Sequence, residues 1–140
     1  MPSDRGHRAL PHTADVILEA WAPDLAACLE EAVDALVDTY AEADEGARRD
    51  PYDVRLPPGP PERVLVDLLD EVVYALDTAD GVPVGASVRS LDEAGLHAVL
   101  WLAPPDQVSP TGSVPKAVSH SELAVDEAPG AVSCRFLVDV

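Results

Sequence analysis

The sequence predicts an α+β fold of two layers, with two amphipathic helices packed on one face of a mixed or antiparallel sheet. Two segments show apolar residues at helical three- and four-residue steps, one from Leu25 to Tyr40 and one that begins after Pro61. The remaining segments alternate apolar and polar residues with a period of two, which is typical of half-buried strands. A strand, a helix, a strand and a helix followed by several strands is an order that favours α+β architecture.

The first helix is predicted to begin after Asp24, which serves as its N-cap. One face of this helix is apolar and belongs to the core: Leu25, Cys28, Leu29, Ala32, Val33, Leu36, Val37 and Tyr40. The opposite face is acidic, and we expect it to be solvated: Glu30, Glu31, Asp34 and Asp38. The row of carboxylates therefore predicts no binding site by itself.

The second helix follows a stiff connector, residues 57–61, which is rich in proline and cannot continue a helix or a central strand. Proline is favourable in a first helical turn, so the helix begins there. The turn residues Asp80 and Gly81 end it. Its predicted core stripe is Leu65, Leu68, Leu69, Val72, Val73 and Leu76.

The strands are predicted from alternation and from the turn residues between them. We expect an exposed loop at 104–115, where four prolines fall close together. The expected strands cover residues 16–21, 52–56, 84–89, 97–102, 116–125 and 132–140, with turns at 92–95 and 126–130. No internal repeat is visible, so residues 1–140 are interpreted as a single domain.

The composition bounds the possible functions. The chain has 140 residues and a formal net charge of −17, which disfavours direct, high-affinity binding of RNA or DNA. Two interpretations of the acidic surface stay open: a solvated surface, or one that docks on a basic protein partner. No apolar run reaches the roughly 20 residues of a membrane span, so we expect a cytoplasmic protein. Cys28 and Cys134 are expected to be buried, reduced thiols.

Common catalytic motifs are absent. The sequence has no phosphate-binding glycine-rich loop, no Gly-x-Ser-x-Gly elbow, no His-Glu-x-x-His and no Cys-x-x-Cys pair. Ser119 and His120 are adjacent, but neighbouring residues of a strand point to opposite faces and cannot form a nucleophile–base pair. This pattern argues against an independent hydrolase.

The remaining candidate is a metal site formed by carboxylate oxygens. If the strand at 16–21 and the strand that ends at Val140 are neighbours, Asp15, Asp139 and the terminal carboxylate of Val140 converge at one edge of the sheet. Two carboxylates about 4 Å apart repel by about 4 kcal/mol at an effective dielectric constant of 20, so they need a cation or a proton. Such oxygens suit Ca²⁺ or Mg²⁺ better than zinc. The alternative is that Asp15 caps a turn and Asp139 lies at a frayed strand end.

Two further residues have both a functional and a structural interpretation. His12 precedes the first strand and is either a ligand, an orienting group or a structural hydrogen-bond partner. Lys116 is the only lysine in the chain. It either holds a phosphate or a partner's carboxylate, or it is an ordinary surface lysine.

The order and spacing of several short motifs resemble the archease family over nearly the whole chain. These motifs are His12-Thr13-Ala14-Asp15, Leu29-Glu30-Glu31-Ala32, the run from Leu65 to Glu71 with its exit at Leu76-Asp77-Thr78, Lys116-Ala117-Val118-Ser119-His120, and Leu137-Val138-Asp139-Val140. The family usually continues Lys-Ala-Val with Thr-Tyr-His, where this chain has Ser119, His120 and Ser121. A role of the family's histidine therefore does not transfer.

The resemblance implies a non-enzymatic accessory protein of an RtcB-type tRNA-splicing ligase, which promotes guanylylation and repeated turnover of that ligase. It implies a metal site formed by Asp15, Asp139 and the Val140 main chain, with Lys116 as a further functional position. Ca²⁺ is the expected ion, and Mg²⁺ or Mn²⁺ are alternatives. A second hypothesis is a small metal-dependent enzyme acting on phosphoesters or nucleotides, with His12 or His120 as its base. A third is a chaperone-like binder without an ion.

Overall fold

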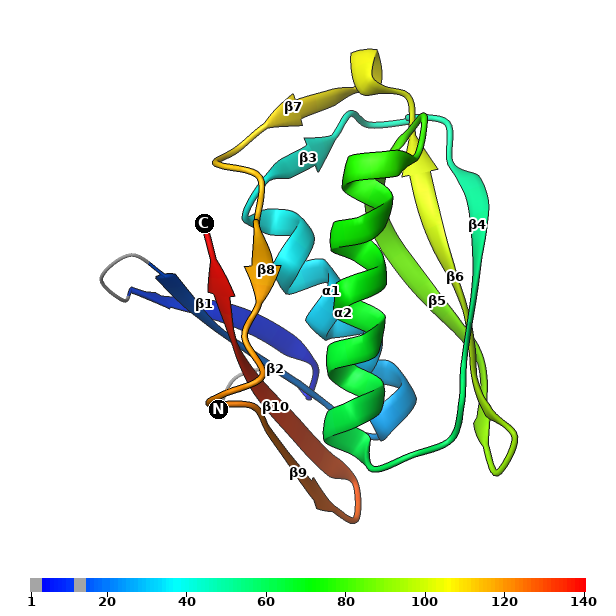
Figure 1. Ribbon diagram of the computed structural model, residues 1–140, viewed down its shortest axis with the longest axis vertical. Coiled ribbons are helices and arrows are strands. Elements are labelled where there is room, and N and C mark those ends of the chain that lie inside the picture. The colour runs from blue at the N-terminus through cyan, green and yellow to red at the C-terminus, as the bar shows by residue number, and fades with distance from the viewer. Residues whose placement is uncertain (1–3, 12–14) are drawn as a thin grey trace.

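The computed structural model describes residues 4–11 and 15–140 of the chain, and Figure 1 shows its elements. Two α-helices and one 3₁₀ helix are present in this part: α1 (Leu25–Asp38), α2 (Pro61–Thr78) and η1 (Pro105–Gln107). The strands are β1 (Gly6–Pro11), β2 (Asp15–Ala22), β3 (Ala41–Ala43), β4 (Asp50–Leu56), β5 (Val82–Asp92), β6 (Gly95–Ala103), β7 (Val108–Pro110), β8 (Ala117–Val118), β9 (Ala124–Ala128) and β10 (Ala131–Asp139).

The strands divide into three antiparallel sheets. The first sheet has the order β1-β2-β10-β8, with β9 also paired to β10. The second has the order β4-β6-β5, and the third is the pair β3-β7. Helix α1 packs against β2 and β5, and α2 packs against β8, β4 and β5, so both helices contact both larger sheets (Figure 1). The α+β class is confirmed, and the division into three sheets is a detail that the sequence pattern did not specify.

The core lies between the helices and the inner faces of the two larger sheets, because Val54 of β4 and Leu100 of β6 belong to the same cluster as the residues of β2 and β10. Alternate residues of β2 and β10 are buried there, and Phe136 is fully buried. The apolar stripes predicted for both helices belong to the same cluster. The inner-face residues of β2 and β10 are Leu18, Ala20, Ala22, Val132, Cys134, Phe136 and Val138. Among the described residues, no helix is both long and apolar enough to cross a membrane.

The starts of both helices are explained by the residues at their N-terminal ends. The Asp24 carboxylate accepts a hydrogen bond from the Ala27 amide at 2.8 Å, which satisfies one of the unpaired donors of the first turn. Helix α2 begins with Pro61 after the stiff connector, and its N-cap makes no side-chain hydrogen bond. Proline at this position removes a donor that would otherwise lack a partner. Both predicted starts are confirmed.

The predicted hairpin between β5 and β6 is present, with Asp92 opposite Gly95. Gly95 has φ +112°, and a Cβ atom there would lie 2.1 Å from the Leu56 carbonyl oxygen. Only glycine fits, because any side chain would meet the backbone that leaves β4.

The last third of the chain differs from the expectation in three places. The single strand expected at 116–125 is interrupted between β8 and β9, where Glu122 adopts φ +56°. Residues 126–128 continue β9 instead of forming a turn, which begins only at Pro129. The expected loop at 104–115 contains η1 and β7, and β7 pairs with β3. The secondary structure of these segments depends on backbone pairing with strands that are distant in the sequence. The local residue pattern does not reveal that pairing.

The N-terminal strand β1 was not expected, and it changes the interpretation of the acidic face of α1. His7 Nδ1 lies 3.0 Å from Glu31 and its Nε2 lies 2.6 Å from Asp38, while Arg5 pairs with both Glu30 and Glu31. Glu31 is only 8% exposed. Glu30 also accepts a hydrogen bond from the Val88 amide at 2.8 Å. The prediction of a merely solvated face is therefore wrong for Glu30 and Glu31, which join α1 to β1 and β5.

Burial raises the pKa of Asp34 to about 6, and the neighbouring Glu31 carboxylate acts in the same direction. Burial alone would lower the pKa of His7, but its hydrogen bonds to Glu31 and Asp38 raise it above the ordinary value. A raised pKa in the folded state means that the protonated form stabilises the fold. The contribution of Asp34 is complete below its ordinary pKa and is lost as the pH rises through about 6.

The substitution Asp34→Asn is expected to stabilise the protein at pH 8, because it removes a charge that folding partly buries. The gain should be about 1 kcal/mol after allowance for solvent screening, and it should shrink between pH 8 and pH 5. Urea unfolding of wild type and variant at the two pH values measures it. The exposed strand residue Asp126 provides the control, since Asp126→Asn should change stability little at either pH. A gain that grows toward pH 5 would contradict the assignment.

Candidate functional site

The antiparallel pairing of β2 with β10 places Asp15 directly opposite Asp139. The predicted adjacency of these two strands, from opposite ends of the sequence, is thereby confirmed (Figure 1). Directly opposite residues project from the same face of a sheet. Val138 points into the core and is fully buried, so its neighbour Asp139 belongs to the outer face of the sheet, with Asp15. Because β1 and β8 flank these strands, the two aspartates lie at one end of interior strands.

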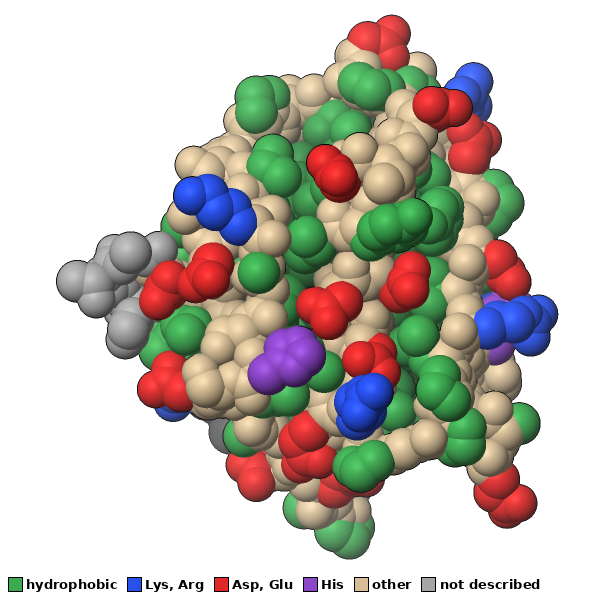
Figure 2. Space-filling model, in the orientation of Figure 1, with side chains coloured by type: hydrophobic (Ala, Val, Ile, Leu, Met, Phe, Trp, Pro, Cys, Tyr) green, Lys and Arg blue, Asp and Glu red, His purple; other side chains and the backbone are tan. Residues whose placement is uncertain are grey.

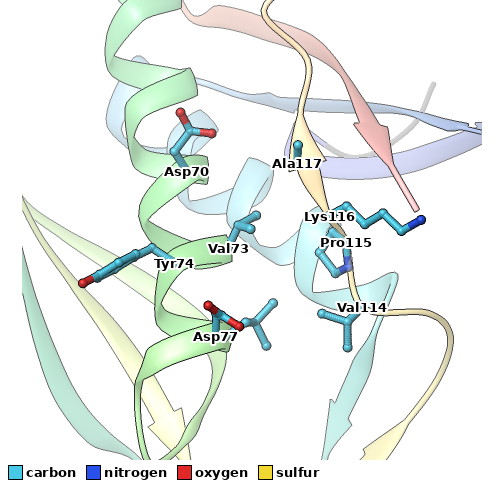
Figure 3. Close-up of a pocket in the computed structure, with 9 residues that line it drawn as sticks. Asp70, Val73, Tyr74, Asp77, Val114, Pro115, Lys116 and Ala117 are labelled. Atoms are coloured by element: carbon cyan, nitrogen blue, oxygen red, sulfur yellow. The ribbon is translucent and has the colours of Figure 1, made fainter.

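Strand β8 brings Lys116 to the same place. The Lys116 amide donates a hydrogen bond to the Asp139 carbonyl oxygen at 2.9 Å, and Ala117 is the strand partner of Asp139. Figure 3 shows the Lys116 side chain extending toward the C-terminal end of β10. Val140 follows directly and is 37% exposed. The structure therefore brings together Asp15, Asp139, Val140 and Lys116, while His12 lies outside the described residues.

The donor set at this point suits a hard divalent cation. Carboxylates directly opposite each other on one face of a sheet repel, and a cation between them removes that repulsion. In the described part of the chain, no group of three or more His, Cys, Asp or Glu side chains is placed to hold a metal ion. The side-chain ligands here would be two carboxylates, Asp15 and Asp139. Ca²⁺ takes about six to eight oxygen ligands, so main-chain, water or partner oxygens would complete such a shell.

Ser119 and His120 make contacts that do not join them as a catalytic pair. The Ser119 hydroxyl lies 2.8 Å from the Ser121 hydroxyl and accepts a hydrogen bond from the Ser121 amide at 3.1 Å. His120 Nε2 lies 3.6 Å from the Asp70 carboxylate on α2. Ser119 and His120 were expected to be kept apart because neighbouring strand residues point to opposite faces. That reason is wrong, because both residues follow β8 and are not in a strand.

A groove beside Lys116 was not anticipated from the sequence. It has a volume of about 620 Å³ and lies between α2 and the segment 114–117 (Figure 3). Tyr74 and Val114 line it and are 59% and 61% exposed. The sequence did hold one signal, because Tyr74 is an aromatic residue next to, and not within, the apolar stripe of its helix.

Comparison with known proteins identifies the family. The family model described as the archease protein family (MTH1598/TM1083) matches residues 7–140. The chain is 33% identical over 135 residues to the probable archease proteins of two Mycobacterium tuberculosis strains, an alignment that covers 96% of this chain and 75% of each relative. The chain belongs to the archease family.

Two solved structures share the fold. The solution structure of protein 1598 from Methanobacterium thermoautotrophicum matches with a TM-score of 0.72 and 21% identity, covering 96% of this chain and 99% of that one. The crystal structure of a Thermotoga maritima archease, described as a possible chaperone, matches with a TM-score of 0.69 and 16% identity, covering 95% and 96%. At these identities the likeness concerns the fold.

In the presence of a chelator, Asp139→Asn is expected to stabilise the protein by about 0.5 kcal/mol, because it removes one of two directly opposed charges. Urea unfolding in EDTA measures the change. Glu127→Gln is the matched control, since Glu127 is an exposed strand carboxylate whose partner across the strands is Val132. Equal effects of the two substitutions would show that Asp15 and Asp139 do not interact in the metal-free protein.

Proposed function

We propose that this archease is a non-enzymatic accessory protein of an RtcB-type tRNA-splicing ligase, and that it promotes guanylylation and multiple turnover of the ligase. The observation that carries the proposal is the direct opposition of Asp15 and Asp139 on the outer face of the sheet, with Lys116 on the segment whose backbone bonds to Asp139. Asp139 and Lys116 are exposed and Asp15 is half-buried, so a partner protein can reach all three side chains.

A divalent cation is part of the proposal. Asp15, Asp139 and the Val140 main chain would hold it, with Ca²⁺ as the expected ion and Mg²⁺ or Mn²⁺ as alternatives. A bound cation would neutralise the opposed carboxylates and supply positive charge that attracts phosphate oxygens. The ammonium group of Lys116 would contact a phosphate or a carboxylate of the partner at the same end of the sheet.

The charge of the protein favours a protein partner over direct contact with RNA. A net charge of −17 repels a phosphate backbone, whereas a protein that itself binds RNA carries basic surface. Complementary charge of this kind accelerates association and orients the two proteins. The chaperone-like interpretation shares the protein partner but gives no role to the opposed aspartates.

The contacts of Ser119 and His120 bear on the alternative of an independent enzyme. An independent enzyme needs a base held close to a nucleophile or to a metal-bound water. Ser119 pairs with Ser121, and His120 lies on the α2 side of β8 near Asp70. Ser119 and His120 therefore do not form a nucleophile–base pair, while His12, the other base of the phosphoesterase hypothesis, lies outside the described residues.

Added Ca²⁺ is expected to raise the thermal midpoint of the wild-type protein in a concentration-dependent way, because a ligand that binds only the folded state stabilises it. Asp139→Asn should abolish this shift, and Glu127→Gln should retain it. Calorimetric unfolding over a Ca²⁺ series, repeated with Mg²⁺ and Mn²⁺, identifies the preferred ion. A flat response of the wild type to all three ions would remove the cation from the proposal.

The accessory role is tested by ligase guanylylation and multiple-turnover RNA joining with the cognate ligase. Asp15→Ala and Asp139→Ala are each expected to reduce stimulation at saturating protein by about tenfold or more, since each removes one of two side-chain ligands. Circular dichroism confirms that both variants fold. The control is Asp126→Ala, an exposed carboxylate on β9 that should stimulate like the wild type. Undiminished stimulation by both variants would refute the role of the carboxylate pair.

A further inference from the structure

The groove between α2 and segment 114–117, here called the α2 groove, has an apolar interior. Val73 and Leu76 of the helix and Pro115 and Ala117 of the segment line it, and Figure 3 shows Val73 directed toward the segment. Tyr74 and Val114 lie on its two sides and are two of the three large apolar side chains that are exposed among the described residues. Scattered exposed apolar residues are ordinary on protein surfaces, but two on opposite walls of one groove mark a site for another apolar group.

The helix side of the α2 groove is acidic. Asp70 and Asp77 are seven residues apart on α2, so they lie on the same face of the helix, two turns from each other. Tyr74 stands between them (Figure 3). Lys116, on the opposite wall, is the one cationic residue among the described lining residues. Figure 2 shows acidic side chains distributed among apolar ones across this face of the molecule.

We propose that the α2 groove binds a segment of a partner protein that carries an apolar side chain flanked by arginine or lysine. The apolar side chain would fill the space between Val73 and Val114, beside Tyr74, and the flanking cations would contact Asp70 and Asp77. The volume of about 620 Å³ accommodates a few side chains of such a segment. The inference rests on the proposed function, because it takes the ligase as the protein that supplies the segment.

Charge disfavours the other classes of occupant. A nucleic acid would place phosphates against Asp70 and Asp77 on a chain whose net charge is −17. A second copy of this chain would bring together two surfaces of the same sign, each on a protein with that charge. A basic and apolar protein segment is attracted by both features of the groove.

The position of the α2 groove separates docking from the action of the carboxylate pair. Lys116 lines the groove, and its amide is bonded to the Asp139 carbonyl oxygen at 2.9 Å. A segment held in the groove therefore lies beside the end of the sheet that carries Asp15 and Asp139. The groove determines how tightly the partner binds, and the aspartates determine what happens once it is bound.

The test titrates the cognate ligase with increasing amounts of wild-type protein and variants and measures guanylylation. The double variant Tyr74→Ser with Val114→Ser, and the single variant Asp77→Lys, should each raise the half-maximal concentration by about tenfold or more and leave the saturating rate unchanged. All three residues are exposed, so the substitutions preserve the core. Glu93→Lys, an equal charge reversal in the distant β5–β6 hairpin, is the control and should behave as the wild type.

The two proposals fail in different ways. Unchanged half-maximal concentrations for both groove variants, with wild-type protein active, would overturn the α2 groove inference and leave the proposed function intact. Absence of stimulation by the wild type would overturn both. Sedimentation of the free protein tests the remaining occupant: a dimer that the Tyr74→Ser and Val114→Ser substitutions dissociate would identify a second copy and overturn the inference.

Discussion

The register between β2 and β10 is the constraint on which the rest of the candidate site depends. A shift of one residue would move Asp139 to the buried face of the sheet and Val138 to solvent. The buried Phe136, which lies opposite Leu18, prevents this, because a slip of β10 would turn Phe136 toward water. The apolar inner face of the sheet thus fixes the position of the two aspartates on its outer face. One face of the β2–β10 pair packs in the core, and the other face carries the two aspartates.

The N-terminal strand reinforces this arrangement from the other side. Strand β1 pairs with β2, and its side chains Arg5 and His7 reach the carboxylates of α1. These contacts hold the helix over the sheet with ionic and hydrogen-bonded links in addition to apolar packing. Glu31 is buried with two basic partners, Arg5 and His7, and such pairing is the condition under which a buried carboxylate is tolerated.

Part of this structure was predictable from the sequence, and part was not. The helices were predictable, because Asp24 and Pro61 mark their starts and their apolar stripes follow helical spacing. The adjacency of Asp15 and Asp139 was a hypothesis from alternation and family resemblance, and the register confirms it. The three-sheet division, the break between β8 and β9 and the α2 groove depend on contacts between distant segments. The local pattern of one segment does not reveal which distant segment it will contact in the folded chain.

Strand β8 is only two residues long, and its attachment to β10 has a mechanical consequence. So short a strand is held by few backbone bonds, with the buried Val118 as its anchor. Segments with so few buried contacts open locally at a lower free energy than the core. The same strand carries a wall of the α2 groove and borders Asp139. Local opening of β8 would therefore alter the wall of the groove and release the hydrogen bond from the Lys116 amide to the Asp139 carbonyl oxygen at the same time.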